Sequence, residues 1–183
     1  FEAVRYAFFQ VMSVLSTAGF ATTDFNLWPE ISRWVLVMLM FCGACAGSTG
    51  GGMKIGRVML MGKAAHCEIR RLIRPRTVNR VMINGKAVDD DTIRGSLIFS
   101  FLYVLLLLVC TLVVSIDGFD MVTNFTASLS CLSNVGPGLG LVGPMGNFAM
   151  YSPLSKIVLT VAMLIGRLEV FPILILFSPS LWK

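Results

Sequence analysis

An all-α integral membrane protein is the fold class that the sequence predicts, on three observations. Hydrophobic residues make up 56% of the 183 residues and charged residues only 14%, whereas soluble domains have about 25% charged residues. Ser96 to Ile116 is 21 residues long and has no charge, which meets the ~20 residues that a helix needs to cross a bilayer. Basic residues gather in one region, since Lys54 to Arg94 holds ten of the 15 Lys and Arg.

This charge distribution predicts a topology. Lys54 to Arg94 carries ten basic and four acidic residues, whereas Asp117 to Tyr151 carries two acidic residues and no basic one. Because loops with excess Lys and Arg stay on the cytoplasmic side, we expect residues 54–94 and the C-terminus to be cytoplasmic. A nucleic-acid patch is the alternative, and the topological interpretation is favoured because the basic loop lies between apolar segments.

The first segment is a short apolar helix, Phe1 to Ser16, which is too short to span a membrane and continues directly into the polar sequence TAGFATTDF. Irregular backbone at membrane depth is tolerated only where it is buried in protein or lines a water-filled path. We therefore expect a re-entrant helix and loop.

A broken helix follows. Trp34 to Met53 is uncharged over 20 residues but contains five glycines, three of them consecutive. Since Gly costs up to ~1 kcal/mol against Ala inside a helix, we expect half-helices over Trp34 to Ala46 and Met53 to about Arg71, separated by GSTGGG at 47–52.

The next region, Arg70 to Asp91, is polar and basic, and Asn84-Gly85 between short β-prone runs predicts a small hairpin. Asp91 or Thr92 is expected to cap the following helix, which should end near Asp117-Gly118. This helix is the one complete, unbroken span that the sequence predicts.

The pattern of the first segment then recurs. Phe119 to Ser133 is a short semi-polar helix followed by a loop rich in Gly and Pro, and Leu154 to Phe177 is another apolar segment, interrupted by Arg167, Glu169 and Pro172. A charge at the bilayer centre costs ~2.5–3.5 kcal/mol, so it usually faces a cavity. A shift of 117 positions aligns Phe8 with Phe125, Ser13 with Ser130, Leu15 with Leu132, Ser16 with Ser133 and Gly19 with Gly136.

Both glycine loops suit a potassium filter. Such a filter replaces hydration water with backbone carbonyls, and glycine lets the backbone aim them inward. The sequences at these places are Thr17-Ala18-Gly19-Phe20 and Asn134-Val135-Gly136-Pro137. Each loop alone is a weak signal, and the repeated order of helix and loop makes it stronger.

Four segments, TAGFATTDF, CGACAGSTGGGMK, LSNVGPGLG and GRLEVFPILILFSPSLWK, resemble the Trk/Ktr/HKT superfamily of potassium transporters, in particular its Trk-type membrane subunits. The resemblance covers essentially the whole chain. It implies M1-P-M2 potassium-channel-like repeats with re-entrant pore loops and a broken M2 helix. Residues 1–75 would then hold the pore loop and broken second helix of repeat three, residues 76–91 a cytoplasmic linker with a short hairpin, and residues 92–183 repeat four, with M1 at 92–117, pore helix and filter at 119–138 and M2 at 153–178.

The resemblance also implies a function, potassium uptake across the bacterial inner membrane through a channel-like pore whose loops face the outside. The transported K⁺ would be the only cofactor, held at Thr17, Ala18, Asn134 and Val135. The implied filter is Thr17, Ala18, Gly19, Asn134, Val135 and Gly136, and the implied gate is Gly47, Ser48, Thr49, Gly50, Gly51, Gly52 and Arg167. Neither loop has the TVGYG sequence of ordinary potassium channels. The implied partners are the lipid bilayer, a second copy in a homodimer and a cytosolic nucleotide-binding regulatory subunit of the RCK type, similar to TrkA.

Other classes fit less well. An ion-coupled symporter that moves potassium with H⁺ or Na⁺ by alternating access stays open, because broken helices and repeats also build carriers. A non-conducting membrane subunit is disfavoured by the filter-like loops. An enzyme is not expected, because GSTGGGMK lacks the GK[ST] of a phosphate loop and the single His66 has no catalytic or zinc-binding partners.

Overall fold

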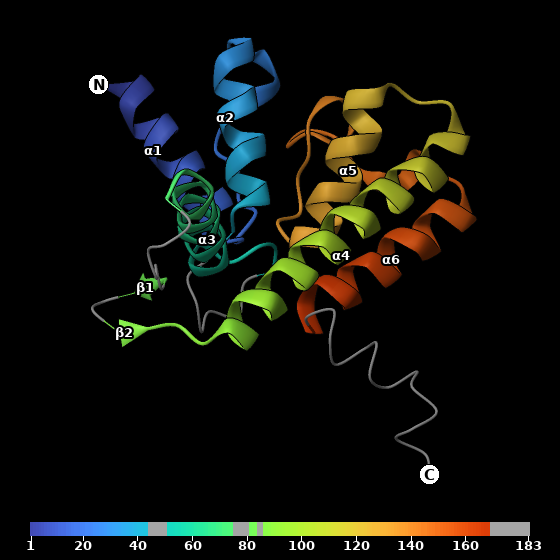
Figure 1. Ribbon diagram of the computed structural model, residues 1–183. Coiled ribbons are helices and arrows are strands. Elements are labelled where there is room, and N and C mark those ends of the chain that lie inside the picture. Colours follow the sequence, from blue (N-terminus) through green and yellow to red (C-terminus); the bar gives the residue numbers. More distant parts are fainter. Residues whose placement is uncertain (44–50, 75–80, 84–85, 169–183) are drawn as a thin grey trace.

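The computed structural model describes residues 1–43, 51–74, 81–83 and 86–168, which form α-helices and short 3₁₀ turns apart from one small hairpin (Figure 1). The α-helices are α1 (Glu2–Leu15), α2 (Glu30–Phe41), α3 (Ile55–Ile73), α4 (Asp90–Val114), α5 (Met121–Ser133) and α6 (Pro153–Leu168). Strands β1 (Met82–Ile83) and β2 (Lys86–Ala87) pair antiparallel, with Met82 opposite Ala87. They flank Asn84-Gly85, where the sequence predicts a hairpin.

Helix α2 begins four residues before the predicted half-helix. Pro29 stands at its N-cap position and Glu30 lies in its first turn. The sequence prediction started at Trp34 because it followed the uncharged run and so left out the charged first turn. Helix α2 ends at Phe41, before Gly43, and α3 begins only at Ile55; residues 44–50 lie outside the described part.

Helix α4 begins one to two residues before the predicted cap. Asp89 occupies the N-cap position without a side-chain hydrogen bond, and Asp90 and Asp91 lie in the first turn. The prediction of Asp91 or Thr92 as the cap was therefore wrong. Negative side chains are stabilising throughout the first turn of a helix, because they face the positive end of its dipole, so three consecutive aspartates leave the cap position ambiguous.

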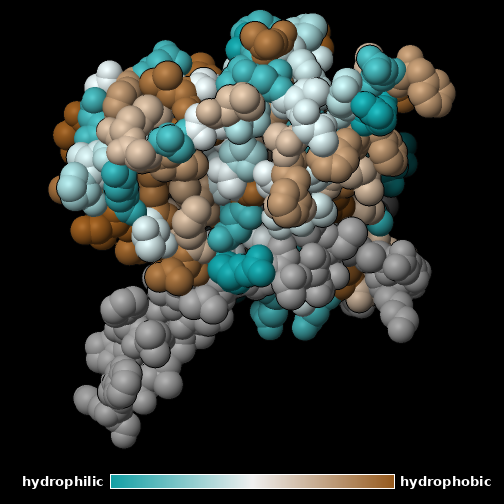
Figure 2. All heavy atoms as spheres, turned by 180° about the vertical axis from the view of Figure 1, so that it is seen from behind, coloured by the Kyte–Doolittle hydropathy of each residue, from teal (hydrophilic) through white to brown (hydrophobic). Residues whose placement is uncertain are grey.

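Two different faces of α4 are apolar. One is buried, with Phe99, Tyr103, Leu107, Cys110 and Val114 packed in the core. The other is exposed and carries Ile98, Phe101, Leu105, Leu108 and Leu112. Within the described part, the stretch Asp90–Asp117 is the one helical segment long and apolar enough to cross a membrane. Apolar side chains also cover much of the molecule when it is seen from behind (Figure 2).

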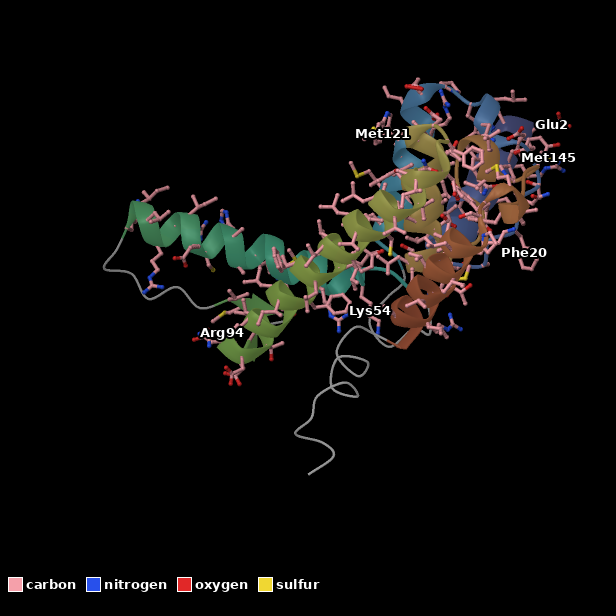
Figure 3. The ribbon with its side chains drawn as sticks, turned by 90° about the vertical axis from the view of Figure 1, so that its right-hand side faces the viewer. Glu2, Phe20, Lys54, Arg94, Met121 and Met145 are labelled. Carbon is pink, nitrogen blue, oxygen red and sulfur yellow. The ribbon has the colours of Figure 1, made fainter. Side chains whose placement is uncertain are left out.

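Helix α5 is the centre of the structure. It packs against α4, α6 and α2, and ten of its residues, from Thr123 to Ser133, are buried. Figure 1 shows α4 and α6 side by side in front of α5, with α1 and α2 on the other side. Figure 3 shows Arg94, near the start of α4, far from Met121 at the start of α5. The α5 helix therefore enters from the end of the molecule opposite to the basic region.

A buried hydrogen bond joins α4 to the last turn of α5. The Tyr103 hydroxyl lies 2.7 Å from Ser133 Oγ, and the two residues are 1% and 0% exposed. Tyr103 also packs edge-on against Phe41 at the end of α2, with ring centroids 5.5 Å apart. A single tyrosine thus links three helices.

Replacing Tyr103 by Phe should destabilise the protein by about 1–2 kcal/mol, because Ser133 Oγ would keep its place in the core without its partner. Thermal unfolding of the full-length protein in detergent measures the effect. The matched control is Tyr6→Phe, since Tyr6 is only partly buried. Equal melting temperatures for Tyr103→Phe and the wild type would contradict the importance of this bond.

Candidate functional site

Helices α1 and α5 end in the same way. Thr17, two residues after the end of α1, and Asn134, directly after the end of α5, both have a left-handed backbone with φ of 56°. The glycine two residues later is also at positive φ, 75° at Gly19 and 113° at Gly136. These pairs are separated by the 117 positions of the sequence repeat. In the part of the chain that the structure describes, Thr17 and Asn134 are the only residues other than glycine with positive φ.

The backbone hydrogen bonds of the two loops also correspond. Thr17 N donates to Val14 O at 3.1 Å, and Asn134 N donates to Cys131 O at 3.2 Å. At the next position, Ala18 N donates to Ser13 O at 2.9 Å. Its counterpart, Val135 N, donates to Ser130 O at 3.0 Å. The repeat found in the sequence therefore has a structural counterpart in these backbone hydrogen bonds.

The side chains of Ser13 and Ser130, which the sequence repeat pairs, form additional hydrogen bonds to the loops. Ser13 Oγ donates to Phe20 O at 2.6 Å, whereas Ser130 Oγ accepts from Gly136 N at 3.1 Å. The sequence alignment paired these serines without assigning them a role. Both connect the last turn of a short helix to the loop that leaves it.

The two loops are in contact. A β-carbon on Gly19 would overlap the Val135 carbonyl oxygen and approach Pro137 Cδ to 3.3 Å, and one on Gly136 would lie 3.9 Å from Gly19 Cα. The structure thus brings Gly19 against Val135 and Gly136, and with them the two short segments that hold the six predicted filter residues, Thr17, Ala18, Gly19, Asn134, Val135 and Gly136. Their binding of potassium stays a prediction.

The helix ends give this place a negative potential. The C-terminus of an α-helix carries a partial charge of about −0.5 from its aligned peptide dipoles. Since α1 ends at Leu15 and α5 at Ser133, both negative ends lie at the paired loops. A cation is the kind of ion that this arrangement stabilises.

Of the predicted glycine gate, Gly51 and Gly52 are described, and Gly47, Ser48, Thr49 and Gly50 lie outside the described residues. A β-carbon on Gly51 would overlap the Ser133 carbonyl oxygen, and Gly52, at φ of 80°, lies against the Ser133 side chain. The end of the glycine segment therefore contacts the end of α5, directly beside the candidate filter.

Arg167, the other predicted gate residue, lies in the last turn of α6 and is exposed. The preceding residue, Gly166, packs so closely that a β-carbon would overlap the Leu132 carbonyl oxygen. Asn134 Nδ2 also donates to Met163 O at 3.1 Å. Helix α6 therefore brings Arg167 to the same end of α5 that Gly51 contacts; Glu169 lies outside the described residues.

Beyond the loops, the Asn26 side chain joins the segment that follows the first loop to the segment that follows the second loop. Its Nδ2 donates to Gly140 O at 3.1 Å, and its Oδ1 accepts from Gly140 N at 2.9 Å. Asp24 Oδ1 accepts from Asn26 N at 3.0 Å and orients the turn. The sequence prediction missed Asn26, because the 114 positions that separate it from Gly140 leave no local signal.

Comparison with known proteins identifies the family of this chain. The family model described as "TrkH: Cation transport protein" matches residues 2–183. The Trk system potassium uptake protein TrkH of Salmonella typhimurium is 39% identical over 180 residues, which cover 98% of this chain and 37% of that protein. The TrkH protein of Vibrio parahaemolyticus is 39% identical over 183 residues, covering 100% and 37% of the two chains.

The crystal structure of the potassium transporter TrkH from Vibrio parahaemolyticus superimposes with a TM-score of 0.86 at 38% identity, covering 100% of this chain and 38% of that one. The chain spans a little over a third of the length of these relatives. With a family model matched over nearly every residue, the chain belongs to the TrkH family of cation transport proteins.

Proposed function

We propose that this chain supplies two of the four filter loops of a potassium uptake pore in a bacterial inner membrane. The observation that carries the proposal is the contact between two equivalent loops, each placed at the C-terminal end of a short helix. The named function of the relatives, potassium uptake, points to the same ion. Because the relatives are longer, the remaining loops would come from the rest of the pore.

In this proposal the loops conduct by replacing the hydration shell of K⁺. Backbone carbonyls from Thr17 to Gly19 and from Asn134 to Gly136 take over from water, and the negative ends of α1 and α5 stabilise the ion. The glycines permit the required backbone, and Ser13 and Ser130 hold it in place. No protein group has to change charge for an ion to pass.

The repeats would have the M1-P-M2 order of a potassium channel. Helices α4, α5 and α6 then act as M1, pore helix and M2 of repeat four, while α1 is the pore helix of repeat three and α2 and α3 form its broken M2. Figure 1 shows α1 and α5 running in the same direction. Repeats of the same direction favour a channel over the inverted repeats of many carriers. Unitary currents from the full-length protein support the channel, whereas strict coupling to H⁺ or Na⁺ supports the symporter.

The gate would consist of Gly47 to Gly52 together with Arg167. Gly51, in the segment before α3, and Arg167, in α6, reach the same end of α5. A glycine segment changes its backbone at little steric cost, and a fixed cation below the filter repels potassium.

The partners follow from this topology. The apolar face of α4 would contact lipid. The basic end of α3, with Arg70 and Arg71 exposed in its last turn, would face the cytoplasm and offer a docking surface for the nucleotide-binding regulatory subunit. The full-length protein would assemble as a homodimer.

Replacing Gly19 or Gly136 by Ala should lower potassium flux roughly tenfold, because a β-carbon in a left-handed backbone costs about 1–2 kcal/mol and at Gly19 it also overlaps a loop carbonyl. Flux of the radioactive congener ⁸⁶Rb⁺ into proteoliposomes measures the effect. Gly62→Ala is the matched control, since a β-carbon on Gly62 meets nothing within 4 Å. Unchanged flux in both filter variants would count against the filter assignment.

Replacing Asn26 by Ala or Leu should reduce the preference for K⁺ over Na⁺ more than it reduces total flux. The two hydrogen bonds to Gly140 together stabilise the contact by about 1–3 kcal/mol. Without them, one loop can move relative to the other. Reversal potentials under mixed K⁺ and Na⁺ measure the preference. Asn147→Ala removes a purely local bond to Ala149 N and should leave selectivity unchanged; the same loss in both variants would show that Asn26 has no special part in it.

Replacing Arg167 by Ala, or deleting part of Gly47 to Gly52, should raise the basal flux several-fold because the barrier below the filter is removed. The measurement is ⁸⁶Rb⁺ uptake by the full-length protein without its regulatory subunit. The control is Lys156→Ala, a cation on the same helix whose Nζ donates to Ala149 O at 2.8 Å near the other end. If flux is the same with and without these changes, the gate lies elsewhere.

A further inference from the structure

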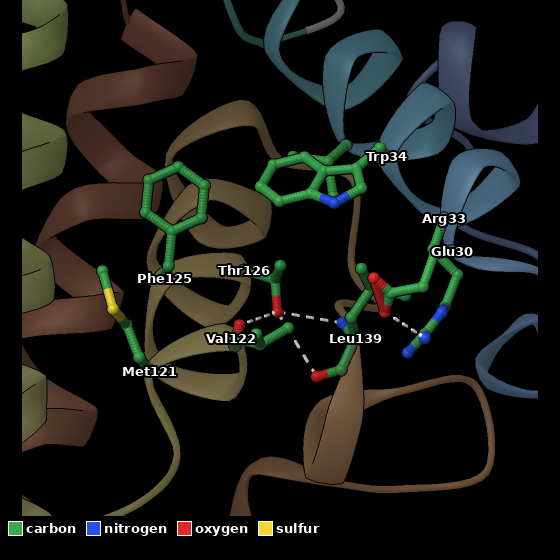
Figure 4. A pocket seen from close by; sticks show the side chains of 9 residues that line it. Glu30, Arg33, Trp34, Met121, Val122, Phe125, Thr126 and Leu139 are labelled. Atoms are coloured by element: carbon green, nitrogen blue, oxygen red, sulfur yellow. Dashed lines mark hydrogen bonds and ion pairs between the residues drawn. The ribbon is translucent and has the colours of Figure 1, made fainter.

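A cavity of about 310 Å³ between α2 and α5 has no part in the proposed conduction path. Figure 4 shows it from close by, with α2 on one side and α5 on the other. Its volume is at the lower end of the ~300–1,000 Å³ of small-molecule sites. The lining residues are Glu30, Arg33, Trp34 and Val37 of α2, Met121, Val122, Phe125 and Thr126 of α5, and Leu139.

The walls of the cavity are mainly apolar. Phe125 and Met121 project from the α5 side and Trp34 from the α2 side, with the indole nitrogen of Trp34 on the side of Thr126 (Figure 4). Thr126 Oγ1 already has protein hydrogen-bond partners, because it donates to Val122 O at 2.7 Å and accepts from Leu139 N at 2.9 Å. The interior therefore suits a hydrocarbon chain, with the indole N–H as one polar group.

One positive and one negative side chain stand together at the edge. An Arg33 guanidinium nitrogen, Nη2, lies 2.5 Å from Glu30 Oε1. Arg33 Nε is buried and has no hydrogen-bond partner among the described residues. A buried N–H without an acceptor costs about 1–3 kcal/mol, so this group favours a ligand that brings an acceptor.

The cavity lies at a membrane interface in the proposed topology. It is formed by the N-terminal parts of α2 and α5 together with Leu139, and Met121 lies far from the basic end marked by Arg94 (Figure 3). Tryptophan is enriched where hydrocarbon meets headgroups, and Trp34 is 58% exposed beside the cavity. The neighbouring exposed side chains of α2 are apolar: Ile31, Val35 and Met38.

We propose that this cavity binds a phospholipid with an ethanolamine headgroup, with part of one acyl chain against Trp34 and Phe125. The lipid phosphate accepts from the Arg33 guanidinium, whose side chain is 30% exposed, after a small rotation that also turns the unpartnered Nε toward it. The primary ammonium donates to the Glu30 carboxylate. The inference rests on the membrane orientation of the proposed function. A zwitterion matches the paired charges, whereas a choline headgroup has no N–H donor and a glycerol headgroup leaves Glu30 beside an uncompensated phosphate.

The test uses the full-length protein in phosphatidylcholine vesicles that contain increasing fractions of phospholipid brominated on its acyl chains, since bromine quenches nearby tryptophan. Subtracting the tryptophan fluorescence of the Trp34→Phe variant from that of the wild type gives the fluorescence of Trp34 alone. We expect half-maximal quenching of Trp34 at a several-fold lower fraction of brominated phosphatidylethanolamine than of brominated phosphatidylcholine or phosphatidylglycerol. Trp28, isolated in the same way with Trp28→Phe, should show no headgroup preference.

Glu30→Gln and Arg33→Gln should each abolish the preference of Trp34 without abolishing its quenching, because contact with bulk lipid persists. Equal quenching of wild-type Trp34 by all three lipids would overturn the proposal, as would no quenching at all, which would mean that another part of the full-length protein covers the cavity. Potassium flux in the same vesicles separates the two hypotheses. If the protein conducts potassium but Trp34 shows no headgroup preference, the lipid site alone is overturned. If Trp34 shows the preference but the protein does not conduct potassium, the proposed pore alone is overturned.

Discussion

The short helices α1 and α5 end at the paired loops, and their last carbonyls and the backbone that follows need hydrogen-bond partners there. Lipid offers none, and the ends of helices leave up to four carbonyls unpaired. Thr17 and Asn134 supply these partners in the same way. Their left-handed backbone turns the chain so that the following N–H groups donate to carbonyls in the last turn of the helix. For a β-branched residue such as Thr17 this conformation is strained by about 1–2 kcal/mol. That the strain occurs at the equivalent place in both repeats ties it to the loop that follows.

Close packing of backbone on backbone depends on these turns. Gly19 contacts Val135, Gly51 contacts Ser133, and Gly166 contacts Leu132, each with no room for a β-carbon. A larger residue at any of these positions would push a loop or a helix away from the end of α5. Since α5 also receives the Tyr103 hydroxyl at Ser133, its last turn is held from several directions at once. The fold therefore concentrates its tightest contacts around the candidate filter.

Local patterns predicted much of this structure. The repeat of 117 positions located both loops, because short apolar helices followed by glycine are visible in a single sequence. The glycines at 47 to 52 indicated that α2 and α3 are separate helices, although α2 ends earlier than predicted, at Phe41 and not at Ala46. Helix starts were less accurate, since charged first turns such as Glu30 and Asp90 fall outside uncharged runs. The contacts of Asn26, Tyr103 and Gly166 could not be predicted, because each joins segments 30 or more positions apart, and neither periodicity nor local turn chemistry encodes such pairings.

The three consecutive residues Leu132, Ser133 and Asn134 connect the candidate filter with both parts of the candidate gate. Helix α6 reaches them through Gly166 and through the bond from Asn134 to Met163 O, and the glycine segment reaches them through Gly51. Carrying Arg167 away from this place by a movement of α6 would require that bond to break and Gly166 to separate from Leu132. Packed contacts of this kind have discrete arrangements rather than continuous ones. If Arg167 and the glycine segment form the gate, its opening would therefore also change the support of Asn134, and the candidate gate and candidate filter would be coupled through the end of α5.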